Sequence, residues 1–201
     1  MTRISCIVEG HGEVIAVPVL LRRIGEWRSP QEYVDVPPPI RVHRDRFLNR
    51  DDEFSRHLKL ASSKCGDDGW VLILLDADDD CPATMGQQIL DRARHVVPHK
   101  AVSVVLAKRE YEAWMIGAAD SLNGCRGLNI SPADLQIDAE APRDAKGWLR
   151  ERKSDRTYGE TTDQAAFSAI MDLAQAHARC RSFRKLCSEW DHQLARRPAG
   201  N

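Results

Sequence analysis

Short apolar runs alternate with helix-like segments along the first half of the chain. The runs span residues 4–8, 70–75 and 101–107, with a shorter one at 40–42, and they show almost no polar alternation. Such runs are typical of strands buried on both faces of a sheet. Apolar residues recur at helical spacing in 17–27, 52–64 and 84–96. Strands that alternate with helices pair in parallel, so we expect an α/β fold with a mainly parallel, Rossmann-like sheet and helices on both faces.

The second half of the chain has a different pattern. Residues 123–144 are rich in Gly, Pro, Asn and Asp and are expected to be loops. Two amphipathic helices should follow, one marked by Phe167, Ile170, Met171, Ala174 and Ala178 and one by Phe183, Leu186, Cys187, Trp190 and Leu194. We therefore expect an α/β core over 1–122 and, over 123–201, a loop-rich segment with C-terminal helices that pack on it. A chain of 201 residues suits this single domain.

Composition indicates the class of protein and its cellular location. Hydrophobic residues make up 42% and charged residues 29% of the chain, as in soluble globular proteins. The apolar run at 70–75 is far shorter than the roughly 20 residues of a membrane helix, and no signal peptide follows Met1. The six cysteines lack CxxC spacing and are expected to be reduced, mostly buried thiols. We expect a cytoplasmic protein without a membrane partner.

Charge is segregated along the chain although the net charge is only −1. Residues 67–80 contain six aspartates and no basic residue, whereas arginine and lysine predominate in 143–156 and 179–197. A nearly neutral protein has no overall attraction for nucleic acid, so any binding must come from local basic regions.

Acidic residues follow three of the predicted strands. The ligand site of an open parallel sheet lies beyond the carboxyl ends of its strands, so these acids should meet at one edge. Carboxylate oxygens select Mg²⁺ or Mn²⁺. Each acid alone also has a structural explanation as a helix cap, a dipole partner or a helix start, and the conjunction favours a metal site. The candidate ligands are Glu9, Glu13, Asp76, Asp78 and Asp80, and the candidate catalytic acids are Glu9, Glu13, Asp76, Asp78, Glu110 and Glu112.

Other residues near these acids have less specific patterns. Gly10 and Gly12 form no GK[ST] or GxGxxG motif, which argues against a nucleotide loop. His11 either touches the substrate, donates a proton or only shapes the turn. Basic residues that neutralise phosphate are expected beside the acids, although a solvated helix face explains each of them equally well. They are Lys108, Arg109, Arg150, Arg152 and Lys153.

The order of these motifs resembles the TOPRIM domain in the form found in overcoming-lysogenization-defect (OLD) nucleases. The motifs are Val8-Glu9-Gly10 with Glu13, Asp76-Ala77-Asp78 and Arg109-Glu110-Tyr111-Glu112-Ala113-Trp114. The chain looks closest to a small stand-alone form found beside ATPases in bacterial genomes, whose C-terminal signature is similar to Tyr158, Asp163, Phe167, Cys180, Ser182-Phe183 and Leu186.

The resemblance implies that Glu9, Asp76 and Asp78 hold divalent metal, that Glu13 is the additional acid of the OLD-type site, and that Glu110 or Glu112 is the acid after the fourth strand. It implies a metal-dependent nuclease, acting on DNA in preference to RNA, with an AAA/ABC-type ATPase partner in a phage-defence system. Hydrolysis is expected, because the chain has no separate domain with a topoisomerase tyrosine. Two alternatives remain open: a catalytically silent adaptor that binds an ATPase, and a phosphohydrolase that acts on nucleotides.

Overall fold

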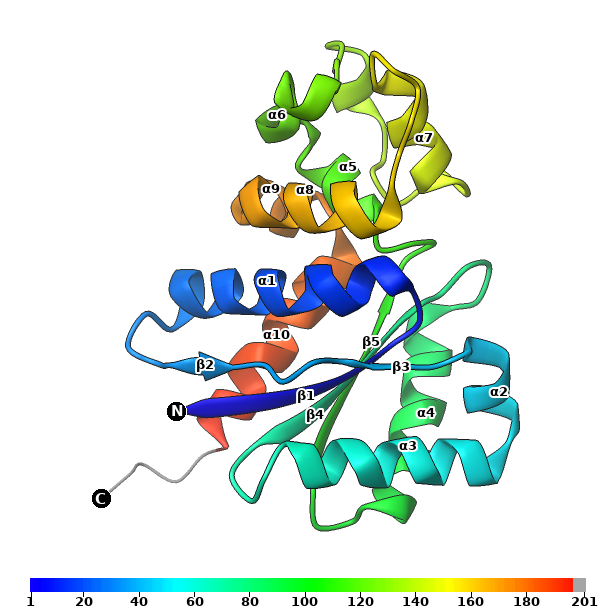
Figure 1. Cartoon of the computed structure of the whole chain (residues 1–201), viewed down its shortest axis with the longest axis vertical. Coiled ribbons are helices and arrows are strands. Elements are labelled where there is room, and N and C mark those ends of the chain that lie inside the picture. The colour runs from blue at the N-terminus through cyan, green and yellow to red at the C-terminus, as the bar shows by residue number, and fades with distance from the viewer. Residues whose placement is uncertain (197–201) are drawn as a thin grey trace.

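The computed structural model describes residues 1–196 and contains one parallel sheet. Its strands are β1 (Thr2–Val8), β2 (Val34–Asp35), β3 (Ile40–Arg41), β4 (Trp70–Asp76) and β5 (Ala101–Ala107). They lie in the order β2-β1-β4-β5 (Figure 1). The first residues of β1 pair with β2, and its last residues pair with β3. Every pairing among these strands is parallel. The expected α/β fold with a mainly parallel sheet is confirmed.

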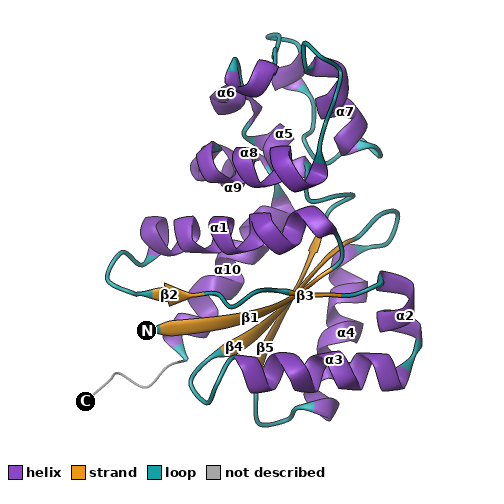
Figure 2. Cartoon of the chain, viewed as in Figure 1, coloured by secondary structure: helices purple, strands orange, loops and turns teal. Residues whose placement is uncertain are grey.

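Helices cover both faces of the sheet, which explains why its strands are apolar on both sides. The helices α1 (His11–Arg28) and α10 (Arg181–Ala195) lie on one face, over side chains such as Leu72 and Leu74. On the other face, α3 (Asp51–Lys64) and α4 (Pro82–Val96) cover Val71 and Ile73. The short α2 (Arg44–Asn49) joins β3 to α3 (Figure 2).

A further group of helices stacks on α1, on the side away from the sheet (Figure 1). It consists of α5 (Ala113–Gly117), α6 (Ala119–Leu122), α7 (Ala145–Arg152), α8 (Ala165–Ile170) and α9 (Leu173–Arg179). Short 3-10 turns at Cys125–Gly127 and Asp134–Gln136 interrupt the expected loop region. Both C-terminal helices were expected on the sheet, but only α10 returns to it, at β5, whereas α8 packs on α1. We call α5 to α9 the helical layer.

The single helix expected over 167–178 is in fact two helices, α8 and α9. The chain is extended at Asp172, which caps α9 by accepting a hydrogen bond of 2.8 Å from the amide of Ala174. Arg23 of α1 donates to the carbonyls of Ser168 and Met171, at 2.8 Å each. Local capping and this bridge from α1 therefore outweigh the continuous helical pattern.

A π-helix, Glu160–Gln164, brings the helical layer against the first turn of α1. A Cβ atom on Gly12 would lie 2.1 Å from Gln164 Oε1 and 2.4 Å from the carbonyl oxygen of Glu160. Only glycine fits at this contact, so the layer reaches the same turn that carries Glu9 and Glu13.

Two expectations from composition can be compared with the structure. All six cysteines are free, and Cys6, Cys65, Cys180 and Cys187 are buried, whereas Cys81 is exposed. Across residues 1–196, each helix is too short or too polar to cross a membrane.

Candidate functional site

Four carboxylates gather where β1, β4 and β5 end. Glu9 directly follows β1, Asp76 is the last residue of β4, Glu13 lies in the first turn of α1, and Glu112 precedes α5. Desolvation raises the pKa of Asp76 well above its ordinary value, and the carboxylates of Glu13 and Glu112 raise it further. We call Glu9, Glu13, Asp76 and Glu112 the inner carboxylates.

Backbone amides hold two of the inner carboxylates in place. Glu13 Oε2 accepts hydrogen bonds from the amides of Glu9 and Gly10, both at 3.0 Å, and so closes the turn between β1 and α1. Asp76 Oδ1 accepts a bond of 2.8 Å from the amide of Tyr111. The acids at the ends of β4 and β5 are thereby connected through the backbone.

Two buried oxygens of the inner carboxylates have no hydrogen-bond partner among residues 1–196: Oε2 of Glu9 and Oε2 of Glu112. Glu112 is fully buried, and its other oxygen accepts from Tyr158 Oη at 3.0 Å and from Gln164 Nε2 at 3.1 Å. Burial raises the pKa of Glu9 and of Glu112 to about 7 each. Unpaired buried oxygens of this kind are satisfied by a proton or a cation.

Lys146 of α7 supplies positive charge to the inner carboxylates, and sequence reasoning missed it. Burial alone would lower the pKa of Lys146, but Glu112 and Asp76 lead the carboxylates that raise it above its ordinary value. Its ammonium group also lies 3.4 Å from Glu160 Oε1. The amide of Lys146 donates to Glu110 Oε2 at 3.0 Å. Glu110 therefore anchors the start of α7, while Glu112 lies among the inner carboxylates.

Three further acids lie on the exposed loop after β4, and we call them the outer aspartates: Asp78, Asp79 and Asp80. Arg44 pairs with Asp80 at 2.6 Å and with Asp78 at 3.8 Å. Asp79 pairs with Arg109 and, at 3.3 Å, with Arg143. Arginines thus compensate each outer aspartate.

The loops after β4 and β5 are joined at two residues with left-handed backbone conformation, Asp78 (φ 48°) and Arg109 (φ 66°). The amide of Asp78 donates to the carbonyl of Arg109 at 3.0 Å, and Arg109 Nη1 donates back to the carbonyl of Asp78 at 3.1 Å. Such conformations cost about 1 kcal/mol or more for residues other than glycine, so the reciprocal hydrogen bonds stabilise them.

Two of the basic residues expected to contact phosphate have partners within the helical layer. Arg152 pairs with Asp134 at 2.7 Å, and its guanidinium lies over the ring of Trp148, 3.8 Å from the centroid. Lys153 is buried and pairs with Asp163 at 2.9 Å.

The other expected residues lie closer to solvent. Lys108 and Arg109 follow β5 at the sheet edge and are partly buried. Arg150 is exposed and lies 3.9 Å from Asp144. His11 is exposed at the start of α1, with no hydrogen bond or ion pair among the described residues.

An open pocket of about 360 Å³ borders the acids. Its lining consists of Glu9, Arg41, Val42, His43, Arg44, Asp45 and Asp78. The basic members come from the end of β3 and the start of α2. Sequence reasoning did not single them out, although the base-rich run at 41–46 was visible.

The chemistry of the inner carboxylates fits a hard divalent cation, because two of their buried oxygens are unpaired. The inner carboxylates do not form a complete metal site in this conformation. Among residues 1–196, no three His, Cys, Asp or Glu side chains lie close enough together to hold a metal ion. The donor atoms are therefore of the right kind, and metal binding would require them to draw together.

Comparison with known proteins gives one match. The family model described as "Domain of unknown function (DUF4276)" matches residues 8–190. No curated protein matches the chain. No solved structure matches it either.

Proposed function

This chain belongs to the DUF4276 family, and we propose that it is a TOPRIM-like phosphodiesterase that cleaves nucleic acid with Mg²⁺ or Mn²⁺. One observation carries the proposal: the inner carboxylates meet at one edge of a parallel sheet, with two buried oxygens that lack a partner in the part of the chain that the structure describes. A purely structural site has no need to hold such atoms together, because buried polar groups are normally paired. The order of Glu9 after β1 and Asp76-Ala77-Asp78 at the end of β4 supports the TOPRIM-like part.

The proposed metal ligands are Glu9, Asp76 and Asp78, with Glu112 as the acid contributed after β5. Glu112 suits this role better than Glu110, whose Oε2 accepts a bond from the backbone of α7. When bound, a divalent ion would activate water and neutralise phosphate charge. Glu13 maintains the turn through its two amide contacts.

Lys146 has a proposed role towards the substrate. Its ammonium lowers the pKa of both Asp76 and Glu112, and a phosphate at this edge needs a cation to stabilise its developing charge. Without metal the pKa of Glu9 is about 7, so a divalent ion that binds this carboxylate near neutral pH would displace a proton from it. The adjoining pocket, which Glu9 and Asp78 line, would admit the phosphodiester.

A catalytically silent adaptor that binds an ATPase is the second candidate, and Lys146 is the observation that favours it. An ammonium group near Glu112 and Asp76 compensates part of their charge without any metal. In that case the acids and Lys146 would stabilise the packing of the helical layer on the sheet edge.

The deciding experiment incubates the purified protein with plasmid DNA and with RNA, in Mg²⁺, Mn²⁺ or EDTA. We expect cleavage only with a divalent metal. Asp76→Asn and Glu112→Gln should each abolish it, because they keep the side-chain shape and remove a proposed ligand. Asp79→Asn is the matched control, since it removes one charge from an exposed residue that pairs with arginines.

Cleavage by Asp76→Asn and Glu112→Gln at the parent rate would disprove the nuclease mechanism. The incubation is repeated with the ATPase encoded next to the protein, if there is one. A parent protein that binds the ATPase but cuts no substrate in either setting would instead establish the adaptor.

A further inference from the structure

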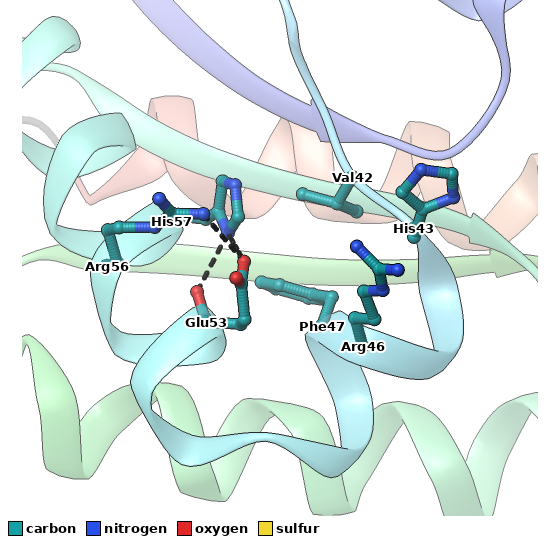
Figure 3. Close-up of a pocket in the computed structure, with 7 residues that line it drawn as sticks. All are labelled: Val42, His43, Arg46, Phe47, Glu53, Arg56 and His57. Atoms are coloured by element: carbon teal, nitrogen blue, oxygen red, sulfur yellow. Dashed lines mark hydrogen bonds and ion pairs between the residues drawn. The ribbon is translucent and has the colours of Figure 1, made fainter.

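A strip of basic side chains leads away from the acidic edge along β3, α2 and the start of α3. The pocket beside Glu9 and Asp78 shares Val42 and His43 with a second pocket, of about 150 Å³. The second pocket is lined by Val42, His43, Arg46, Phe47, Glu53, Arg56 and His57, as Figure 3 shows. The two hollows therefore adjoin at His43. We call Arg41, His43, Arg44, Arg46, Arg56 and His57 the basic strip.

Much of the charge on the basic strip has no ion-pair partner among the described residues. Arg41, His43 and Arg46 are exposed, and no carboxylate in residues 1–196 forms an ion pair with any of them. The far end is partly neutralised, because Glu53 pairs with Arg56 at 2.7 Å and lies 3.5 Å from His57. Of the unpaired residues, Arg41 and His43 line the pocket next to Glu9 and Asp78.

The lining offers charge, and its one hydrocarbon aromatic ring is not exposed for base stacking. Phe47, the aromatic hydrocarbon ring of the second pocket, is buried and packs on Phe54 with ring centroids 4.8 Å apart. Binding through such a lining would depend on phosphates and vary little with base sequence.

We propose that the basic strip is the track that holds the phosphate backbone of a nucleic-acid strand and leads it to the acidic edge. The inference rests on the proposed function, since it places the track beside the phosphodiesterase site. The acids at the edge repel the phosphates of a nucleic-acid strand. The unpaired cations of the basic strip, which lie beside these acids, offset that repulsion.

The test measures binding of a labelled 20-nucleotide single strand, in EDTA so that no strand is cut, across a series of salt concentrations. The variant is Arg41→Gln with Arg46→Gln, one unpaired arginine from each pocket. Each lost phosphate contact should flatten the slope of log affinity against log salt by about 0.7, so the pair should flatten it by about 1.4. If the parent and the variant bind equally at 1 M salt, the variant should bind roughly 25-fold more weakly than the parent at 0.1 M salt.

The matched control is Arg22→Gln with Arg94→Gln, which changes the net charge equally at exposed arginines outside both pockets. It should keep the parent slope. Each single variant, Arg41→Gln or Arg46→Gln, should give about half the effect, so the test survives poor folding of the double variant. Two strands of unrelated sequence should bind alike.

The outcomes separate the track from the catalytic proposal. A parent protein that cuts DNA while Arg41→Gln/Arg46→Gln binds with the parent slope overturns the track and leaves the nuclease standing. A flattened slope in a protein that never cuts supports the track and rejects the nuclease. A parent that binds neither strand at low salt also overturns the track, as does an equal loss in the Arg22→Gln/Arg94→Gln control.

Discussion

The inner carboxylates and the outer aspartates lie at the same sheet edge, yet their surroundings are opposite. The outer aspartates are exposed and pair with Arg44, Arg109 and Arg143. The inner carboxylates are largely buried, share the charge of Lys146 and include two unpaired oxygens. The difference indicates that one set of acids is compensated within the fold, whereas the other still favours a proton or a cation.

The comparison also explains why acid count is a poor guide to a metal site. Exposed ion pairs contribute about 0–1 kcal/mol, so an aspartate beside an arginine is inexpensive to keep. A buried carboxylate without full compensation costs several kcal/mol, or else it binds a proton and its pKa rises. The raised pKa values of Glu9 and Glu112 follow from this.

Removing the ammonium group of Lys146 should have the largest effect on stability. Lys146→Met leaves the inner carboxylates without their counter-charge, so the free energy of unfolding should fall by about 2–4 kcal/mol at pH 8 without metal. Urea denaturation measures it. The control is Arg143→Met, whose side chain is 76% exposed beside Asp79, and which should cost less than about 1 kcal/mol. Equal losses would erase the distinction between the two sets of acids.

The second prediction concerns pH. Glu112 has a pKa of about 7 in the folded protein against an ordinary value of 4.5, so between these values the folded state binds more protons than the unfolded chain. Stability without metal should therefore fall as pH rises from about 4.5 to 7, by up to roughly 3 kcal/mol from Glu112. Glu112→Gln should remove this part of the slope, and Asp79→Asn should retain it. If the parent and Glu112→Gln had the same pH dependence of stability, the raised pKa of Glu112 would be contradicted.

Metal should stabilise the parent protein by a comparable or smaller amount. A divalent ion at 100 times its Kd adds about 2.7 kcal/mol by mass action, seen as a higher Tm. Asp76→Asn should lose this shift, and Asp79→Asn should keep it. Asp78→Asn should also lose the shift, because Asp78 is the one outer aspartate among the proposed ligands. If Asp76→Asn showed the full increase in Tm, the metal would not bind at the inner carboxylates.

The smallest effect is expected at the edge of the loop. Asp80 pairs with Arg44 at 2.6 Å, with its side chain 48% exposed, so Asp80→Asn should change the unfolding free energy by less than about 1 kcal/mol. Thermal denaturation without metal measures this. Loss of metal-induced stabilisation in the same variant would restore Asp80 to the ligand set predicted from the sequence.

The strands and their ends were predictable because burial on both faces leaves a clear apolar signal. β5 matches its predicted range, β1 ends at Val8 as expected, and β4 continues by one residue to Asp76. The break between α8 and α9 was not predicted, since the cap at Asp172 and the bridge from Arg23 depend on neighbours that a helical pattern does not reveal.

The site was only partly predictable for a similar reason. Acids that directly follow strands are carried to the edge by the fold, so Glu9 and Asp76 could be placed from the sequence. The position of Lys146 near Glu112 depends on the course of residues 123–144. Their sequence has no periodicity from which that course could be predicted. Lys153 was expected beside the acids, yet the chain buries it against Asp163 instead.

The π-helix at Glu160–Gln164 makes the number of residues, and not only their kind, a property of the site. A π-helix accommodates an additional residue relative to the α-helix that continues from it. Deleting Thr162 would leave Gln164 attached to α8 but would turn Glu160 by about 100° around the helix axis, away from Lys146 and Gly12. A chain one residue shorter would thus keep each charged group of the site and still lose the register that joins its two layers.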